Sequence, residues 1–429
     1  MSNPREVALD TLLAVTEEGA YNSISLRQAL RKNGAMSRAD RAFVTQVVNG
    51  CLRNLLYLDF CLNAYSKTPV SKMKPLIRGA LRTGAYQILM MERVPNSAAC
   101  NETVALVKRR GLGALSGFVN GVLRALAQKG APLLPEQDTA ERLSLQYSHP
   151  LWLIKLWLAA YPADFVEALC AQNNTPPPVT VAVNPLWTTP EELARELAQS
   201  GVESEPGHLA AGALRLQHTA DLTKLPAFLE GRFHVMDESA MAAVEALDPQ
   251  PGERVLDACA APGGKTLRMA EFMQNTGEIV ARDLYPHKLE LLEESAARLG
   301  LSIIRTEEYD ATTPETGGTF DRVLADVPCS GLGLLRKKPD LRYKRTGADI
   351  DALVALQREI LTALAGAVRP GGRLVYSTCT LCRKENEKNV DWFLQSFPYE
   401  REGDDRYIYP QIEDADGFYI ARLRRKDER

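Results

Sequence analysis

Short apolar runs alternate with helix-like segments from about residue 233 to the end of the chain, and this alternation restricts the fold more than any other feature. Four runs have the length and apolar character of buried strands, namely Val255–Cys259, Ile279–Asp283, Phe320–Asp326 and Arg373–Cys379. The segments between them repeat apolar residues three and four positions apart, which indicates helices. The pattern predicts an α/β fold with a parallel, doubly wound sheet, in which ligands bind at the carboxyl ends of the strands.

Residues 1–130 are expected to be helical throughout and strongly basic. They contain 18 Lys and Arg against 8 Asp and Glu, although the whole chain has a net charge of −3. Apolar residues recur at helical spacing, as at Leu115, Phe118, Val119, Val122 and Leu126. We expect an all-α bundle that meets a polyanion. On charge alone, a solvated basic face without a ligand is the alternative.

The chain between these two parts is expected to form a connection and a small module. A polar connection begins at Ala131, and a tryptophan-containing helix and short apolar runs such as Val179–Val181 follow. The expected organisation is a helical domain at 1–130, a linker and small α+β module at 131–232, and an α/β domain at 233–429.

The sequence also indicates the compartment. No apolar run approaches the roughly 18–20 residues that a membrane span needs, and the first residues lack the basic and apolar regions of a secretory signal. Eight scattered cysteines in 429 residues do not suggest a disulfide framework. We therefore expect a cytoplasmic protein with no membrane partner.

A loop of small residues joins the first expected strand to a helix. Small residues let a cofactor approach the backbone, and the helix N-terminus offers free N–H groups. The run Gly264-Lys265-Thr266 is similar to the end of a P-loop, but that motif requires a glycine at the position of Cys259, and no G-x-G-x-x-G is present. The candidate cofactor-binding residues of the loop are Cys259, Ala260, Ala261, Pro262, Gly263, Gly264 and Lys265.

Two acids follow the next strands. Asp283 lies 26 residues after Asp257, near the offset at which an acid hydrogen-bonds ribose hydroxyls in doubly wound folds. A helix cap before Pro286 is an equally open interpretation of Asp283. Asp310 follows the apolar Ile303–Ile304, where a third strand is expected to end, and a plain turn residue is its alternative.

Two cysteines also follow expected strands. Asp326-Val327-Pro328-Cys329-Ser330 ends one strand, and Ser377-Thr378-Cys379-Thr380 ends another, so both thiols are expected at the functional edge. A lone cysteine is more often a small buried hydrophobe. That is our interpretation of four others: Cys51, Cys61, Cys100 and Cys170.

Cys379 and Cys382 also form a C-x-x-C pair. A redox disulfide between them is an open alternative. Metal binding would need a second pair or suitably spaced histidines, and the five histidines are scattered, so we expect no metal.

The motifs C-A-A-P-G-G-K-T, D-x-P-C-S and S-T-C-T, in this order and spacing, resemble the RNA cytosine-C5 methyltransferases of the RsmB/NOP family. Residues 1–130 resemble the RNA-binding antitermination factor NusB. Together they resemble the bacterial 16S ribosomal RNA methyltransferases across essentially the whole chain. The resemblance implies a Rossmann-like methyltransferase domain preceded by a small α+β RNA-binding module and a NusB-like domain. It also implies S-adenosyl-L-methionine as cofactor, 16S ribosomal RNA as partner and a monomer.

The resemblance further implies roles for the cofactor residues. It assigns the S-adenosylmethionine loop to residues 259–265, the ribose hydroxyls to Asp283 and the adenine side to Asp310. Asp326 is implied near both the methionine moiety and the target base. The chain departs from the family at Val327, where alanine is frequent, and at Met236, where glutamine is common.

For catalysis, the resemblance matches Cys379 to the nucleophile and Cys329 to the cysteine that releases product. A thiolate that attacks carbon 6 of cytosine makes carbon 5 enamine-like, so that it accepts a methyl group. Asp326 is suited to stabilise the charge that develops on the base. The chemistry of the sequence alone leaves open which of the two thiols attacks.

Other functions remain as alternatives. The same chemistry on 23S ribosomal RNA or transfer RNA is one, and a non-catalytic RNA-binding or antitermination protein is another. A P-loop ATPase is disfavoured by Cys259, and exocyclic-amine methyltransferases carry an aromatic residue where Cys329 stands. The basic run at residues 336–338 is expected to hold the RNA backbone, with a solvated loop as its alternative.

Overall fold

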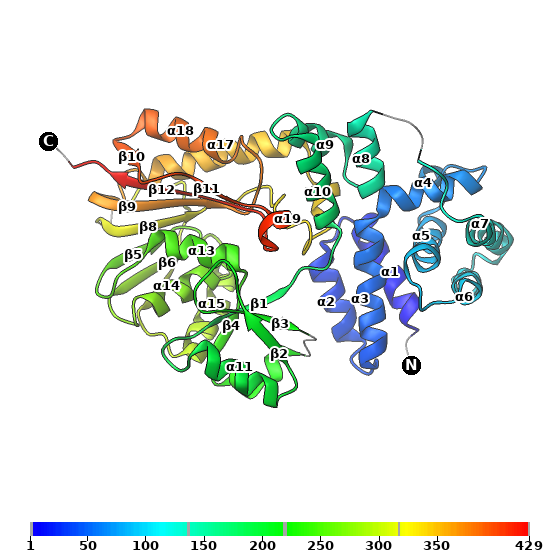
Figure 1. The fold of residues 1–429 in the computed structure, drawn as a ribbon, viewed down its shortest axis with the longest axis horizontal. Helices are drawn as coiled ribbons and strands as arrows, with labels where there is room; N and C mark the ends of the chain where they lie inside the picture. The colour runs from blue at the N-terminus through cyan, green and yellow to red at the C-terminus, as the bar shows by residue number, and fades with distance from the viewer. Residues whose placement is uncertain (1–2, 135–137, 218–220, 316–317, 428–429) are drawn as a thin grey trace. The chain divides into compact units, whose positions relative to one another are not determined.

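The computed structural model describes residues 3–134, 138–217, 221–315 and 318–427 (Figure 1). Backbone contacts divide the chain into two compact units. The first unit comprises residues 1–175 and 335–344, and the second comprises residues 176–334 and 345–429. The domain boundaries expected after residues 130 and 232 follow composition and periodicity rather than contacts, and they stay predictions.

The first unit is helical over its described residues, and for residues 1–130 this agrees with the periodicity, whereas the helices between residues 139 and 173 lie in the stretch assigned to the linker and small module. The third helix begins after Ser37, whose Oγ accepts a hydrogen bond from the Asp40 amide at 3.1 Å. The cysteines Cys51, Cys61, Cys100 and Cys170 are buried free thiols, as interpreted. The helices are α1 (Pro4–Thr16), α2 (Asn22–Lys32), α3 (Arg38–Arg53), α4 (Leu55–Tyr65), α5 (Pro75–Met90), α6 (Asn96–Arg109), α7 (Ser116–Lys129), α8 (Thr139–Tyr147), α9 (Leu151–Leu158), α10 (Ala163–Asn173) and α16 (Leu341–Lys344), with short 3-10 turns η1 (Val70–Lys72) and η2 (Gly113–Leu115).

Residues 335–344, which follow the Cys329 motif in sequence, pack within this helical unit. Arg342 has no exposed surface, and its guanidinium donates to Asn174 Oδ1 at 2.9 Å and to the carbonyl of Ser148 at 3.3 Å. Asp340 accepts from the amide of Asn22 at the start of α2. Arg336 is also buried, at 3% exposure, so the expectation that it holds an RNA backbone is wrong. Lys337 and Lys338 are exposed, and for them the expectation stays a prediction.

A small antiparallel sheet opens the second unit, in the order β2-β3-β1-β4. The helix α11 after its first strand starts with a capping box between Thr189 and Glu192, and it buries Leu193 and Leu197 under the sheet. The small α+β module predicted from the sequence is therefore present. Its elements are β1 (Val179–Val183), α11 (Pro190–Gln199), β2 (Glu203–Pro206), β3 (Ala213–Gln217), η3 (Leu222–Lys224), α12 (Pro226–Leu229) and β4 (Phe233–Val235).

The large sheet of the second unit has the order β10-β12-β9-β8-β5-β6-β7, and β11 pairs with β12. Neighbouring strands are parallel from β9 through β8, β5 and β6 to β7. Strand β12 pairs antiparallel with β9, β10 and β11. The four strands expected from the sequence are confirmed as β5, β6, β8 and β9. The strands are β5 (Arg254–Asp257), β6 (Glu278–Asp283), β7 (Ile304–Glu308), β8 (Phe320–Asp326), β9 (Val368–Thr378), β10 (Tyr399–Arg401), β11 (Arg406–Ile408) and β12 (Phe418–Arg425).

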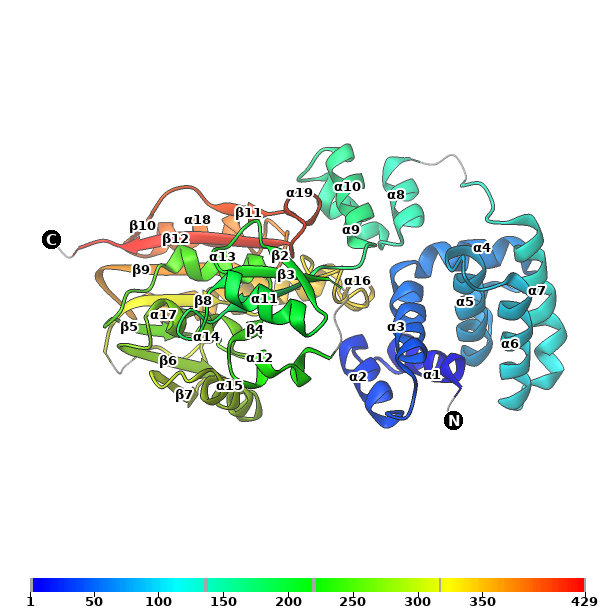
Figure 2. The ribbon, with the colours of Figure 1, turned by 60° about the horizontal axis from the view of Figure 1, so that its bottom comes forward.

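Helices cover both faces of this sheet (Figures 1 and 2). Successive strand residues point to opposite faces. Val255 accordingly joins the core under α13, α14 and α15, and its neighbour Leu256 joins the core under α17 and α18. These helices are α13 (Glu238–Leu247), α14 (Gly264–Phe272), α15 (Pro286–Leu299), α17 (Gly347–Leu364) and α18 (Glu387–Ser396), and a short α19 (Pro410–Glu413) precedes β12. None of the helices in the described part of the chain is long and apolar enough to cross a membrane.

Candidate active site

The parallel strands of the large sheet bring the sequence-predicted acids to one edge. Asp257, Asp283 and Asp326 are the last residues of β5, β6 and β8, and Cys379 follows directly after β9. The register sets Asp257 beside Leu324 and Asp326 beside Ser377. Because the strands are parallel, their carboxyl ends open onto the same crevice.

The loop of residues 259–265 joins β5 to α14 at this edge. The amide of Ala261 donates to Asp283 Oδ2 at 3.2 Å, which ties the loop to the end of β6. Gly263 has φ +110°, a conformation that favours glycine, and a Cβ there would lie 2.5 Å from Leu292 Cδ1. At Gly264, by contrast, the nearest atom to an added Cβ is 3.9 Å away. A Cβ at Gly264 would therefore make only an ordinary contact with Met236, and the first turn of α14 presents backbone N–H groups.

Cys259 lies among the carboxylates of this edge. Burial raises the pKa of its thiol, and the charges of Asp257, Asp326, Asp283 and Asp310 raise it further. The thiol is therefore neutral at physiological pH.

Asp257 and Asp310 differ in their surroundings. Asp257 is 1% exposed and accepts from Thr266 Oγ1 at 2.7 Å, and burial raises its pKa to about 7. Asp310 is exposed, and its Oδ1 accepts from the amide and hydroxyl of Thr312, which lower its pKa. Locally, Asp310 is thus the turn residue that the sequence left as its alternative.

Asp326 and Lys265 form an ion pair inside the crevice. The Nζ of Lys265 lies 2.7 Å from Asp326 Oδ2, and Ser377 Oγ donates to Oδ1 at 2.8 Å. Burial is the largest influence and lowers the pKa of Lys265, but the charge and hydrogen bond of Asp326, together with Cys379 and Asp257, outweigh it, so the net shift is upward. Both carboxylate oxygens are therefore held, and the lysine carries its proton.

The two cysteines predicted at the functional edge, Cys329 and Cys379, lie in contact. The sulfur atoms of Cys329 and Cys379 are 3.2 Å apart. The hydrogen bond to Cys379 raises the pKa of Cys329, and burial adds to this shift. Cys382 is 1% exposed, and burial raises its pKa to about 11. The short sulfur contact thus joins Cys379 to Cys329, which disfavours the C-x-x-C redox interpretation.

Glu385 is part of the site that the sequence analysis missed. It lies in the turn before α18, has no exposed surface, and accepts from the amide of Ser330 at 2.8 Å. Its neighbours in sequence, residues 383–388, are mostly charged, a pattern typical of a solvated surface. No local signal distinguishes this carboxylate from the exposed ones beside it.

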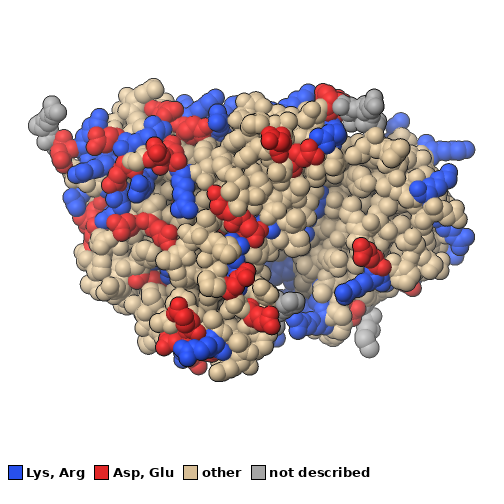
Figure 3. Space-filling model, in the orientation of Figure 1, with Lys and Arg blue, Asp and Glu red and all other residues tan. Residues whose placement is uncertain are grey.

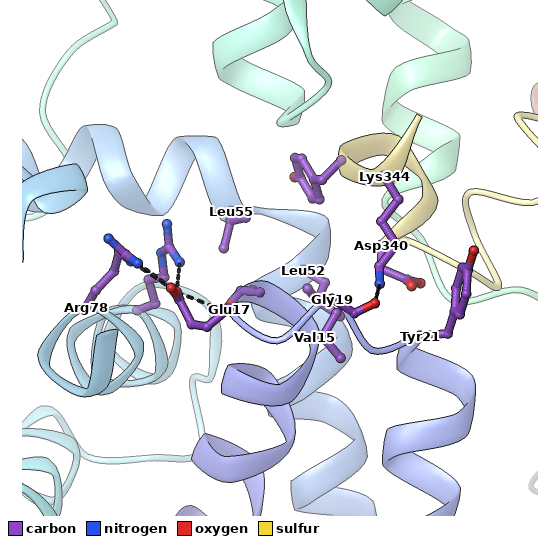
Figure 4. A pocket seen from close by; sticks show the side chains of 12 residues that line it. Val15, Glu17, Gly19, Tyr21, Leu52, Leu55, Arg78, Asp340 and Lys344 are labelled. Atoms are coloured by element: carbon purple, nitrogen blue, oxygen red, sulfur yellow. Dashed lines mark hydrogen bonds and ion pairs between the residues drawn. The ribbon is translucent and has the colours of Figure 1, made fainter. Parts of the chain in front are cut away.

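A separate cavity of about 520 Å³ lies in the helical unit (Figure 4). The cations that line it already have partners: Arg78 bonds Glu17, Arg82 lies 2.7 Å from Asp59, and Lys344 donates to the carbonyl of Gly19. Its charges are internally compensated. Elsewhere in the described residues, no group of three or more His, Cys, Asp or Glu side chains is arranged to hold a metal ion.

Comparison with known proteins gives three matches to family sequence profiles. Residues 244–424 match 16S rRNA methyltransferase RsmB/F, residues 2–128 match the NusB family, and residues 149–223 match the ferredoxin-like domain of RsmF/B-like methyltransferases. The resemblance drawn from the motifs is confirmed by these matches.

Curated relatives and a solved structure agree with these profiles. The chain is 37% identical to the probable ribosomal RNA small subunit methyltransferase B of Bacillus subtilis, over 98% of both chains. It is 35% identical to ribosomal RNA small subunit methyltransferase B of Serratia proteamaculans, also over 98% of both. A crystal structure of a methyltransferase homolog protein from Pyrococcus horikoshii aligns with a TM-score of 0.61 and 27% identity, over 68% of this chain and all of that one.

Proposed function

The chain belongs to the 16S rRNA methyltransferase family RsmB/F, and we propose that it methylates carbon 5 of a cytosine in 16S ribosomal RNA through a covalent adduct with Cys379. Methylation of ribosomal RNA with S-adenosylmethionine follows from the family. The position on the base, the adduct and the target are the proposal. The observation that carries it is the pair of thiols 3.2 Å apart at the ends of β8 and β9.

The two thiols suit the chemistry of methylation at carbon 5. Carbon 5 of cytosine is too weak a nucleophile to accept a methyl group unaided. Attack of the Cys379 thiolate on carbon 6 forms a C–S bond and makes carbon 5 nucleophilic. Bound S-adenosylmethionine supplies the electrophilic methyl group. The carbon 5 proton then passes to a base, the C5–C6 double bond re-forms, and Cys379 leaves as a thiolate.

We assign removal of that proton to Cys329. The hydrogen bond to Cys379 is the largest cause of its raised pKa. Once Cys379 is bonded to carbon 6, the hydrogen bond between the two thiols is lost, and with it the largest cause of the raised pKa of Cys329. The pKa of Cys329 then falls, so that Cys329 can release its own proton to solvent and accept the carbon 5 proton as a thiolate, which supports its role in product release.

We assign Asp326 to contact with the target cytosine. Its carboxylate is fixed by Lys265 and Ser377, and it precedes Cys329 by three residues. The ion-paired carboxylate can accept a hydrogen bond from the exocyclic amine of the cytosine, which orients the ring for attack at carbon 6. Holding the carboxylate in place beforehand avoids reorganisation during the reaction.

The loop after β5 fits the cofactor. The small residues of the loop and the N–H groups of the first turn of α14 suit a ligand that approaches the backbone closely. We assign residues 259–265 to binding, Asp283 to the ribose hydroxyls and Asp310 to the adenine side. The hydrogen bond from the Ala261 amide to Asp283 joins the ends of β5 and β6, which supports a single ligand that spans them.

The helical unit is assigned to RNA binding. Residues 1–130 hold 18 basic against 8 acidic side chains. On the face drawn in Figure 3, Lys and Arg predominate along the outer edge of this unit, whereas the second unit shows both signs interspersed. A basic surface of this kind neutralises phosphates and draws RNA to the protein.

Bisulfite sequencing of ribosomal RNA from cells with and without the gene tests the proposal. We expect one cytosine in 16S ribosomal RNA to lose its methyl group when the gene is deleted. Loss of a methyl group from 23S ribosomal RNA or transfer RNA instead would show that the enzyme modifies those RNAs. An unchanged bisulfite pattern in all RNAs would contradict the proposed reaction.

A further inference from the structure

The carboxylate of Glu385 is buried without an ion-pair partner among the described residues. Its Oε1 accepts from the hydroxyl of Ser330 at 2.5 Å, and its Oε2 accepts from the amide of Ser330 at 2.8 Å and from Nε2 of Gln357 at 3.1 Å. An isolated buried carboxylate is costly, so its hydrogen bonds have to compensate. Two of the three reach the residue that follows Cys329.

Gln357 completes this arrangement from α17. Its Nε2 also donates to the carbonyl of Pro328 at 2.9 Å, and its Oε1 accepts from Asn389 at 2.8 Å. The residues on both sides of Cys329 are therefore held by one buried pair: Pro328 through Gln357, and Ser330 through Glu385.

A second connection joins the same loop to Cys379. The amide of Gly333 donates to the carbonyl of Cys379 at 2.9 Å, and the amide of Gly417 donates to the carbonyl of Gly333 at 2.9 Å. A Cβ on Gly333 would lie 1.9 Å from the Gly417 carbonyl oxygen, so this contact requires glycine. The loop that carries Cys329 is thus fixed at two points. Ser330 is bonded to Glu385, and Gly333 is bonded to Cys379 itself.

We propose that Glu385 is a positioning residue that holds the thiol of Cys329 beside Cys379, so that the covalent adduct resolves. The inference rests on the proposed function, because it takes release of the adduct as the task of Cys329. Positioning by hydrogen bonds suits a step whose rate depends on sub-ångström placement. The charge of Glu385 also raises the pKa of Cys329, which agrees with a close approach of the two groups.

Two substitutions at this position separate geometry from charge. A glutamine can accept from the Ser330 amide and Gln357 through its oxygen and donate to the Ser330 hydroxyl through its nitrogen. Glu385→Gln therefore keeps the hydrogen bonds without the charge, whereas Glu385→Ala removes them. Glu387→Gln is the matched control, because Glu387 bonds Tyr407 rather than the Cys329 loop.

The experiment follows decay of the protein–RNA adduct on denaturing gels, with the full-length chain, unmodified 16S ribosomal RNA and S-adenosylmethionine. We expect Glu385→Ala to slow release on the order of 10²-fold, with S-adenosylmethionine affinity within about twofold of the unsubstituted chain. Glu385→Gln and Glu387→Gln are expected to release within about threefold of the unsubstituted rate. Rescue by glutamine is the readout that a purely structural carboxylate would not give.

Other results overturn the inference. Release at the unsubstituted rate by Glu385→Ala, or slow release by Glu385→Gln, contradicts positioning through hydrogen bonds. If Glu385→Ala does not bind S-adenosylmethionine and is therefore misfolded, Ser330→Ala decides: removal of its hydroxyl is expected to slow release about tenfold, and no change overturns the inference. Absence of any adduct from Cys329→Ala would instead contradict the proposed function, independently of Glu385.

Discussion

The sulfur atoms of Cys329 and Cys379 lie 3.2 Å apart although 50 residues separate them in the chain. Strands β8 and β9 are neighbours in the parallel sheet, with Asp326 in register with Ser377. Each cysteine follows its strand by only a few residues, so the register of the two strands sets the distance between the thiols. A substrate carbon bonded to one sulfur is within reach of the other.

The roles of the two cysteines predict opposite phenotypes. Cys379→Ala removes the nucleophile, so neither methylated product nor covalent adduct is expected. Cys329→Ala leaves attack and methyl transfer intact but impairs release, so a protein–RNA adduct is expected to accumulate. A denaturing gel after incubation with unmodified ribosomal RNA and S-adenosylmethionine distinguishes them. An adduct from Cys379→Ala alone would reverse the assignment, and free methylated product from both variants would exclude a two-cysteine mechanism.

Asp283 is predicted to contribute to cofactor affinity. Asp283→Ala removes charge-assisted hydrogen bonds to the ribose, which contribute about 1.5–3 kcal/mol, so the Kd for S-adenosylmethionine should rise roughly 10- to 100-fold. Titration calorimetry measures this change. Glu308→Ala is the control, because Glu308 is exposed at the end of the neighbouring β7. Equal effects of both substitutions, or binding of ATP in place of S-adenosylmethionine, would refute the assignment.

The pKa of Asp257, raised to about 7 by burial, predicts a dependence of stability on pH. Because the folded-state pKa lies above the unfolded value near 3.8, this group favours folding most at low pH and loses that contribution as the pH rises through 7. Relative to Asp257→Asn, the unsubstituted protein should lose roughly 2–3 kcal/mol of unfolding free energy between pH 5 and 7.5.

Urea unfolding of both proteins at the two pH values checks this difference. Asp404→Asn, at an exposed acid, serves as the control and should show no such difference. Parallel pH profiles for Asp257→Asn and the unsubstituted protein would mean that Asp257 ionises normally in the folded state.

Exposed basic residues of the helical unit are predicted to carry RNA affinity. Deletion of residues 1–175 would uncover Arg342, which belongs to the same unit and is buried against that segment, so charge removal is the cleaner test. Alanine substitutions should weaken RNA binding and reduce the slope of log affinity against log salt by about 0.7–0.9 for each phosphate that the variant no longer neutralises. Filter binding at several salt concentrations measures both, with S-adenosylmethionine affinity as the control. Unchanged RNA affinity at every salt concentration would mean that RNA binds to another part of the protein. The exposed basic residues to be replaced by alanine are Arg27, Arg31, Lys32, Lys108 and Arg109.

The strands and the candidate site could be predicted because both depend on local patterns. A buried parallel strand is a short apolar run, and its end is marked by the first polar residues, so Asp283, Asp326 and Cys379 could be placed at one edge from the sequence. The antiparallel strands β10 to β12 were not predicted. Only β12 is largely buried; the others are three residues long and partly exposed, so their apolar pattern is weak.

The sequence by itself determined the four strands β5, β6, β8 and β9, the positions of the two cysteines and the chemistry they favour, since each follows from residues close together in the chain. Only the tertiary structure decided which residues far apart become neighbours. Glu385 and Arg336 lie in charged runs that look solvated, yet one is buried against Ser330 and the other within the helical unit. The physical reason is that burial of a charge depends on the partners that packing supplies, and the local sequence does not encode those partners.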